Sequence, residues 1–345
     1  MRLSLMAITL SLSVCAADSG GVFGSDGDSS KVIRAGMIGL DTSHVPAFAK
    51  IFNSADAKGD FAKIEIVAAY PGGTDMPASR DRVEGFTEQI RDLGIEIVDT
   101  IPELLERVDV VLLESVDGRI HLQEAVPVIR AGKPLFIDKP VAGSLADAIA
   151  IYDFAKAEGV PIFSSSSLRY SPSIQELLTD EELGDLVGAV AWGSCSYQPG
   201  TPDLYFYGIH GVEILYTLMG PGCQTVTRTH TADTDIVTGG WSDGRLGTYR
   251  GIRKHKAEFG ALAFGTKAIK KSGPTGGYQH LCEQIAKFFV SGQPPIDPDT
   301  TIEMFAFMEA ADESKRRGGG PVQIDEVMGK AREQATQRLE SVTQR

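Results

Sequence analysis

The sequence predicts an α/β domain built on a parallel sheet, followed by an α+β domain with an open antiparallel sheet. From Lys31 to about Phe163, short apolar runs alternate with helical stretches. This alternation is typical of βαβ units and of a parallel sheet. The second half instead has strand-like stretches with a period of two, and one pair turns at Ser242-Asp243-Gly244, as antiparallel hairpins do.

The elements of the first domain follow one another with short connections. We expect strands at VIRAGMIGL, KIEIVAAY, GIEIVD, DVVLLES, PLFID and PIFSSS. We expect helices up to Phe52, from about Arg80 to Asp92, and at IPELLERV, HLQEAVPVIRAG and SLADAIAIYDFAKAEG. Ligands of such sheets bind beyond the carboxyl ends of the strands. The chemistry is therefore expected in the loops after Ile38, Glu65–Tyr70, Leu113 and Ile137.

The second domain mixes strands and helices. Its expected antiparallel strands lie in LVGAVAWGSCSYQ and DIVTGGWSDGRLGTYRGI, and GIHGVEILYTLMG has a helical pattern that ends at Gly220-Pro221. Later helices are predicted at YQHLCEQIAKFFVSG and TIEMFAFMEAADESKRRG. The resulting division is a first domain at 31–163, a second domain at 164–328 and a C-terminal tail at 329–345.

The N-terminus has the pattern of a secretion signal. Arg2 precedes a short apolar run, and Val14 and Ala16 satisfy the small-residue rule for cleavage. We expect a signal peptide at 1–16, a flexible linker at 17–30, and an exported protein in the periplasm or another extracytoplasmic space. Cys15 gives an alternative as a lipid anchor, and a buried N-terminal helix is the other alternative. No later stretch predicts a membrane span.

Composition excludes some partners and leaves others. The net charge of −13 argues against nucleic acid, because a phosphate-binding surface needs a basic face. Three cysteines follow the signal, Cys195, Cys223 and Cys282; an odd, sparse set is no disulfide framework, although a single bridge stays open. The expected partner is a small molecule.

The stretch GMIGLDTSH lies where a dinucleotide-binding protein has G-x-G-x-x-G. Gly39 fills the first glycine position, whereas Asp41 and His44 fill the second and third. Thr42 and Ser43 offer hydroxyl and N–H groups at a helix N-terminus, which favours anions. The charge of Asp41 opposes a pyrophosphate unless the side chain turns away or a cation compensates it. Helix capping by Asp41, Thr42 or Ser43 is the alternative, and no acidic ribose-binding residue ends KIEIVAAY.

Three stretches in one order, AGKPLFIDKPVAGSLADA, SLRYSP and GIHGVEILYTLMG, resemble the Gfo/Idh/MocA oxidoreductases, which include glucose–fructose oxidoreductase and inositol dehydrogenase. The resemblance covers about residues 31–328 and suggests a divergent exported member. It implies a Rossmann-like nucleotide-binding domain and a substrate and oligomerisation domain. It also implies NAD or NADP as cofactor, a carbohydrate substrate (a sugar or polyol derivative) and a homo-oligomer.

The same resemblance suggests roles for side chains in the first two of these stretches. Lys139 takes the place of the family lysine near the nicotinamide and the substrate hydroxyl, and Asp138 replaces the family glutamate. Arg169 is a candidate for binding substrate, with a structural ion pair as an equal alternative. His121 lies at a position where the family often has histidine, and capping or packing is the preferred interpretation.

The third stretch supplies the acid/base candidate. His210 corresponds to the family histidine, and Glu213 follows at i+3 on the same helix face. A carboxylate partner would fix the imidazole tautomer and raise its basicity. Phe206 replaces the family aspartate four residues before the histidine, so proton transfer is expected to be weaker or to take another route. The H-x-x-E spacing alone assigns no metal site.

The sequence therefore supports NAD(P)-dependent hydride transfer on a sugar or polyol as the first hypothesis. The degraded glycine pattern at Asp41 and His44 weakens the redox part of it. Two alternatives stay open: a non-redox carbohydrate lyase or hydrolase that uses the same cleft, and an exported sugar-binding protein without catalysis. Retention of Lys139, His210 and Glu213 favours an enzyme.

Overall fold

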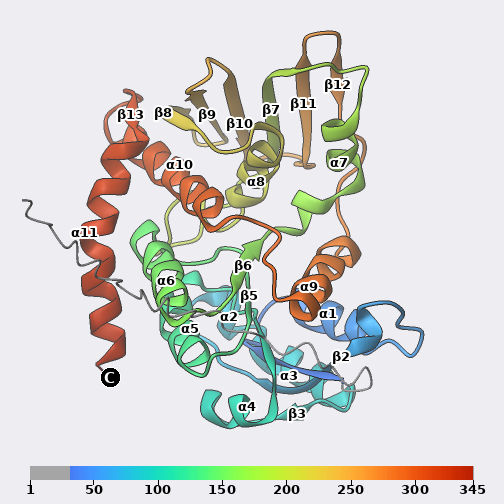
Figure 1. The fold of residues 1–345 in the computed structure, drawn as a ribbon. Coiled ribbons are helices and arrows are strands. Elements are labelled where there is room, and N and C mark those ends of the chain that lie inside the picture. The colour runs from blue at the N-terminus through green and yellow to red at the C-terminus, as the bar shows by residue number, and fades with distance from the viewer. Residues whose placement is uncertain (1–31, 345) are drawn as a thin grey trace, which may run out of the picture. The chain divides into compact units, whose positions relative to one another are not determined.

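The computed structural model describes residues 32–344, which form two sheets with helices packed on them (Figure 1). The predicted signal peptide and linker, with Cys15, lie outside the described residues. Within the described part of the chain, no helix combines the length and hydropathy that a membrane crossing requires.

The first sheet is parallel throughout, as the βαβ pattern predicts, with the spatial order β3-β2-β1-β4-β5-β6. Its strands are β1 (Ile33–Ile38), β2 (Ile64–Tyr70), β3 (Glu96–Ile97), β4 (Val110–Leu113), β5 (Leu135–Asp138) and β6 (Ile162–Ser165). β4, β5 and β6 are buried along their whole length, which explains the apolar run of β4 and the apolar starts of β5 and β6.

Helices cover both faces of this sheet. They are α1 (His44–Phe52), α2 (Pro77–Arg80), α3 (Val83–Asp92), α4 (Ile101–Arg107), α5 (His121–Arg130) and α6 (Leu145–Glu158), with 3-10 turns η1 (Phe61–Lys63) and η2 (Gly118–Ile120). One apolar core includes α1 and α3, and the other includes α4, α5 and α6. The helix predicted over roughly Arg80 to Asp92 is α3, which begins at Val83 because Arg82 has non-helical geometry (φ −127°), and the short helix α2 precedes it.

Helix α6 shows why these predicted boundaries hold. The hydroxyl of Ser144 accepts a hydrogen bond from the N–H of Asp147 at 3.0 Å, which caps the first turn. Gly159 ends the helix in the left-handed conformation (φ 68°), which glycine adopts without a Cβ clash. β6 follows at Ile162.

The second sheet has the order β12-β11-β7-β10-β9-β8-β13 and is antiparallel except for the parallel pair β7–β10. Its strands are β7 (Leu186–Ser194), β8 (Cys223–His230), β9 (Thr234–Trp241), β10 (Leu246–Ile252), β11 (Gly260–Gly265), β12 (Ile269–Lys271) and β13 (Val322–Gln323). Other segments of this half are η3 (Ser167–Tyr170), α7 (Pro172–Thr179), α8 (Gly208–Met219) and α10 (Pro298–Arg316). Both α8 and α10 contact the sheet.

Two late helices pack on the first domain. α9 (Gln279–Ser291) contributes Leu281 and Ile285 to the core that α1 covers. α11 (Ile324–Thr343) contacts α6 and α5, and Figure 1 shows it as the long C-terminal helix beside them. The residues predicted as a C-terminal tail, 329–345, are therefore mostly helix, since Ala331 and Ala335 are buried in the core.

Candidate functional site

A cavity of about 930 Å³ lies between the carboxyl ends of the parallel strands and the second sheet. Residues of the cofactor-type loop, the Lys139 loop and helix α8 all contribute to its wall. Its other lining residues come from β7, β12 and the segments before α8, β11 and α9; they include Trp192, Phe206, Tyr207, Phe259, Lys271 and Tyr278. The predicted location of the chemistry, beyond the strand ends, thus coincides with a real cavity.

The glycine turn after β1 is fixed by packing inside the domain. Gly39 has φ 85°, and a Cβ at this position would lie 2.1 Å from Ser115 Oγ and 2.5 Å from the Ser115 backbone. Only glycine satisfies both the backbone angle and this contact. Gly39 does not line the cavity. Its tight turn instead packs against Ser115 and so fixes the course of the loop that follows β1.

The side chain of Asp41 turns away from the cavity. Its charge therefore does not face the position where a pyrophosphate would bind. Its side chain is fully buried and accepts a hydrogen bond from the Val116 N–H at 2.8 Å. Burial raises the pKa of Asp41, while Ser79, the Val116 N–H and the positive charge of Arg82 act in the opposite direction. The carboxyl group therefore joins the loops after β1 and β4.

The N-terminus of α1 faces the cavity without a side-chain cap. Ser43 is the N-cap residue, but its hydroxyl makes no capping hydrogen bond, so the structure does not support the capping alternative for it. Thr42, Ser43 and Arg82 all line the cavity. Nη2 of Arg82 is buried and has no hydrogen-bond partner within residues 32–344. A helix N-terminus beside an unpaired guanidinium nitrogen is suited to an anion such as a pyrophosphate.

The fit to a dinucleotide is incomplete at the other end of the loop. The Gly39 N–H donates to the Tyr70 carbonyl oxygen at 2.9 Å, and the Leu40 N–H donates to that of Pro71 at 2.8 Å. These two backbone donors are therefore already engaged by the chain that follows β2. No acidic residue ends β2, so the ribose contact of a standard fingerprint has no counterpart there.

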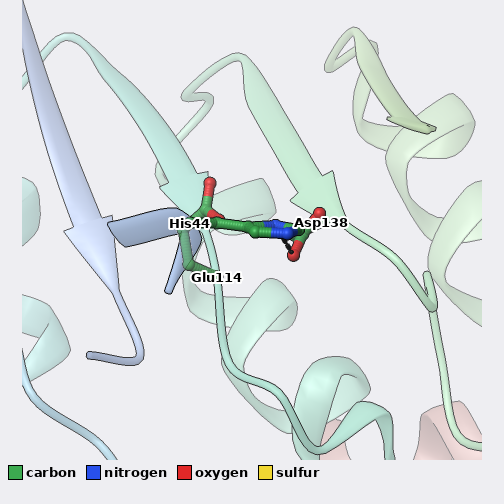
Figure 2. Close-up of side chains that lie close together, drawn as sticks. All are labelled: His44, Glu114 and Asp138. Atoms are coloured by element: carbon green, nitrogen blue, oxygen red, sulfur yellow. Dashed lines mark hydrogen bonds and ion pairs between the residues drawn. The ribbon is translucent and has the colours of Figure 1, made fainter. Parts of the chain in front are cut away.

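His44, the residue in the third glycine position, is a buried partner of Asp138. Its Nδ1 lies 2.7 Å from Asp138 Oδ2, and its ring also lines the cavity. Glu114, which follows β4, completes a cluster with Asp138 at the end of β5 and His44 at the start of α1 (Figure 2). Burial strongly raises the pKa of Glu114, with the charge of Asp138 acting in the same direction and that of Lys139 against it.

Lys139 and His210 line the same cavity, as the resemblance implies. Nδ1 of His210 lies 2.6 Å from Ser166 Oγ. Burial lowers the pKa of His210 well below its ordinary value, and the positive charge of Lys139 adds to this effect. The imidazole is therefore neutral at pH 7, with Lys139 as a nearby fixed positive charge.

Glu213 does not make the expected contact with His210. Its Oε1 accepts hydrogen bonds from Arg169 Nε at 2.7 Å and Ser165 Oγ at 2.9 Å, and its Oε2 accepts one from the Ser166 N–H at 3.1 Å. Glu213 thus holds the segment that carries Ser166, which in turn contacts His210. Arg169 forms the structural ion pair that was the alternative to substrate binding, and it does not line the cavity.

His121 is buried in the first domain, in agreement with a packing role. Its Nε2 lies 2.7 Å from the Ser115 carbonyl oxygen, and its Nδ1 lies 3.3 Å from that of Val141. The residue therefore joins the chain after β4 to the chain after β5. Cys195, Cys223 and Cys282 are buried free thiols, so the bridge left open by the sequence does not form among them.

Glu124 is expected to make folding stability depend on pH. It is buried on α5 and accepts a hydrogen bond from Ser115 Oγ at 2.7 Å. Burial raises its pKa from 4.5 to about 8, so the unfolded chain loses this proton at lower pH than the folded one. The stabilisation of the folded state by protonated Glu124 is complete below pH 4.5. As the pH rises from there toward about 8, this stabilisation decreases by about 1.4 kcal/mol per pH unit.

The measurement is urea unfolding of the wild type and Glu124→Gln across this pH window. The amide keeps an acceptor for Ser115 but cannot ionise, so the variant should lack this component of the slope. Equal slopes in the two proteins would contradict the assignment.

Several residues of the site escaped the sequence analysis. Arg82 lies in the helical-looking PASRDRVEGF, where nothing marks a break. Ser166 is one of four consecutive serines, and its contact with His210 depends on the tertiary fold. Glu114 left a usable signal, because an acidic residue directly after the apolar run VVLL falls at the strand end where ligands bind.

Comparison with known proteins agrees with this architecture. Residues 33–166 match the GFO_IDH_MocA model, described as an oxidoreductase family with a NAD-binding Rossmann fold. The chain is 24% identical over 167 residues to an uncharacterized oxidoreductase of Streptococcus pneumoniae serotype 4, a match covering 43% of this chain and 44% of that protein. It is 28% identical over 132 residues to inositol 2-dehydrogenase 2 of Saccharopolyspora erythraea, covering 36% and 38%.

Both curated relatives are thus matched over less than half of their length. Among solved structures, the fold is similar to that of GenD2 from gentamicin A biosynthesis in complex with NAD, with a TM-score of 0.69 and 18% identity. That match covers 88% of this chain and 99% of the other, so it extends the shared fold through both sheets. Residues 33–166 are therefore similar to the NAD-binding domain of the Gfo/Idh/MocA oxidoreductases, and the likeness to solved structures over the rest of the chain is one of fold.

Proposed function

We propose that the protein is a NAD(P)-dependent oxidoreductase that acts on a sugar or polyol derivative. One observation carries the proposal: Lys139, His210 and the uncapped N-terminus of α1 line a single cavity. The cofactor pyrophosphate would be held by the N–H groups of Thr42 and Ser43 and by Arg82. The match of residues 33–166 to an oxidoreductase family model with a NAD-binding Rossmann fold supports this assignment.

The two polar groups have complementary roles in oxidation of an alcohol. The bound nicotinamide supplies the hydride acceptor. His210, kept neutral by burial and by the charge of Lys139, accepts the hydroxyl proton at a ring nitrogen. The Lys139 ammonium stabilises the negative charge that develops on the substrate oxygen. Ser166 and Glu213 position the imidazole.

The rest of the cavity supports a carbohydrate as substrate. Trp192, Phe206, Tyr207 and Phe259 place aromatic rings in its wall, and such rings pack on the apolar faces of sugars while polar groups fix orientation. Phe206, which replaces the family aspartate, belongs to this aromatic wall. The named activity of the Saccharopolyspora relative, an inositol dehydrogenase, makes myo-inositol the first substrate to test.

Calorimetric titration of the mature protein with NAD(H) and NADP(H) tests the proposal. Micromolar binding is expected, and Arg82→Gln should weaken it by about tenfold through loss of a charge-assisted contact. Arg91→Gln, a change on exposed α3 surface, is the matched control and should bind as the wild type does. The denatured supernatant is checked for nucleotide retained during purification. Absence of both binding and retained nucleotide would overturn the assignment.

Non-redox carbohydrate chemistry in the same cavity is the second candidate. The observation that favours it is the engagement of the Gly39 and Leu40 N–H groups by the chain after β2. Two results together would favour this candidate over hydride transfer: lyase or hydrolase turnover by protein that is free of nucleotide, and no binding of NAD(H) or NADP(H).

Export and self-association are parts of the same proposal. Two large apolar side chains on one face of the second sheet, Leu246 and Ile269, are exposed by 62% and 64%. Burial of this surface against a second copy would produce the homo-oligomer that the family resemblance implies, and light scattering measures it. Sequencing the N-terminus of protein recovered outside the cytoplasm tests export and cleavage after Ala16.

A further inference from the structure

Three side chains beside the cavity form a compact cluster that the proposed hydride transfer does not use. His44, Glu114 and Asp138 each offer one possible ligand atom, and these atoms all lie within 4.8 Å of one another. Figure 2 shows them close together, with Glu114 and Asp138 at the ends of the neighbouring strands β4 and β5 and His44 at the start of α1. Segments distant in the chain thus bring one imidazole and two carboxylates together at the carboxyl edge of the sheet.

The carboxylate of Glu114 has no hydrogen-bond partner among the described residues. It is 0% exposed, and neither of its carboxylate oxygens has a hydrogen-bond partner within residues 32–344. Oδ1 of Asp138 is buried and unpartnered in the same part of the chain. Lys139 is adjacent in sequence, yet it forms no ion pair with either carboxylate among the described residues. Buried carboxyl groups ordinarily have partners or bind metal ions, so three unpartnered oxygens at one cluster call for a ligand.

We propose that His44, Glu114 and Asp138 bind a divalent transition-metal ion, with Zn²⁺ or Fe²⁺ favoured over Mg²⁺ and Ca²⁺. Two carboxylates and a neutral imidazole carry two negative charges, which a divalent ion neutralises. The imidazole ligand selects for the transition metals. Three protein ligands leave at least one coordination position open, as in metal sites that bind water or substrate.

The geometry needs only a small adjustment. Two ligands on one tetrahedral Zn²⁺ with bonds of about 2.1 Å lie about 3.5 Å apart, compared with the present limit of 4.8 Å. Side-chain rotations that move the ligand atoms by about an ångström would bring them to this separation. The ion would replace the present His44–Asp138 contact as the link between these residues. His44 also lines the cavity, which brings the ion to the cavity wall.

This inference goes beyond the proposed function, because it requires neither a nicotinamide cofactor nor a sugar. The probe is Zn²⁺ alone, added to chelator-treated full-length protein and measured as bound metal per chain and as a shift in Tm. One equivalent is expected to bind and to raise the Tm, because the ion binds the folded state. Glu114→Gln keeps the side-chain volume but removes a ligand charge, and should weaken binding by about a hundredfold or more.

Glu124→Gln is the matched control. Glu124 is also a buried glutamate at this edge of the sheet, but it already has Ser115 as a partner, so its variant should bind Zn²⁺ as the wild type does. His280→Ala controls for surface binding, since His280 and Glu283 form an exposed pair on α9.

Three results would overturn the proposal: no stoichiometric uptake by the wild type, unchanged uptake by Glu114→Gln, or loss of uptake in His280→Ala instead. If Glu114→Gln does not fold, the Co²⁺-loaded wild type and His44→Gln decide the question. The d–d bands of bound Co²⁺ must then change in His44→Gln. Bands that stay the same would show that the ion binds elsewhere.

Discussion

Replacing Lys139 and His210 together by alanine should lower kcat by about a thousandfold or more while the fold is retained. Each side chain contributes to a proton transfer or to a developing charge, and such groups contribute about 10²- to 10⁴-fold. The two effects are not expected to multiply, because both residues act on the same oxygen. The assay follows reduction of NAD⁺ or NADP⁺ with myo-inositol and a panel of related polyols and sugars.

Two matched substitutions control for the loss of these side-chain types. Lys287 and His280 lie on the exposed surface of α9, so Lys287→Ala with His280→Ala should leave kcat and KM unchanged. Circular dichroism and Tm establish that each variant folds. Undiminished turnover by the Lys139 and His210 double variant would remove both residues from the proposed chemistry, whichever substrate is found.

Arg228→Met should lower the free energy of unfolding by about 3–5 kcal/mol. Arg228 is fully buried on β8. Its Nε donates to Asp235 Oδ1 at 2.9 Å, its Nη2 donates to Asp203 Oδ2 at 2.8 Å, and its Nη1 donates to Asp312. Removing the guanidinium takes away the ion-pair partner of Asp312, whereas Asp235 keeps Arg253 and Asp203 keeps Lys315. Burial already raises the pKa of Asp312 to about 6 despite Arg228, so its charge would become still less favourable.

The same substitution on the surface is the comparison. Arg316 pairs with Glu313 and Glu309, but its side chain is 57% exposed, and Arg316→Met should cost no more than about 1 kcal/mol. Urea unfolding at pH 7 measures both. Adding Asp312→Asn to Arg228→Met should restore part of the loss, because the carboxylate that lost its ion-pair partner is then neutral. Equal effects of the two arginine substitutions would show that the buried network contributes no more than a surface pair.

The parallel sheet was predictable because its signal is local and repeated. Each buried strand is a short apolar run, and helix ends carry their own markers, such as Ser144 and Gly159 on α6. The parallel β7–β10 pair was not predictable, because strand pairing depends on contacts between distant segments. α11 was missed for a related reason: its buried face is small, with alanines such as Ala331 and Ala335 in place of large apolar residues.

The candidate site followed from the sequence only in part. The strand-end rule located the cavity, and motif positions brought Lys139 and His210 to it. Spacing suggested a His210–Glu213 pair, but the side chain of Glu213 turns to Arg169 and to the Ser165–Ser166 segment. An i+3 relation defines a shared helix face and leaves rotamers undetermined. The direction of Asp41 depended likewise on a partner, the Val116 N–H, that lies 75 residues away.

The return of α9 to the first sheet has a consequence for dissecting the protein. The segment that matches the family model, residues 33–166, does not contain all of the apolar core that its own elements share. It lacks α9, whose Leu281, Ile285 and Phe288 seal one apolar layer, and α11, which lies against α6 on the other side. Expressed alone, it would present these surfaces to water and associate through them. The segment matched by sequence comparison, residues 33–166, therefore differs from the set of elements that we expect to fold together, which includes α9 and α11.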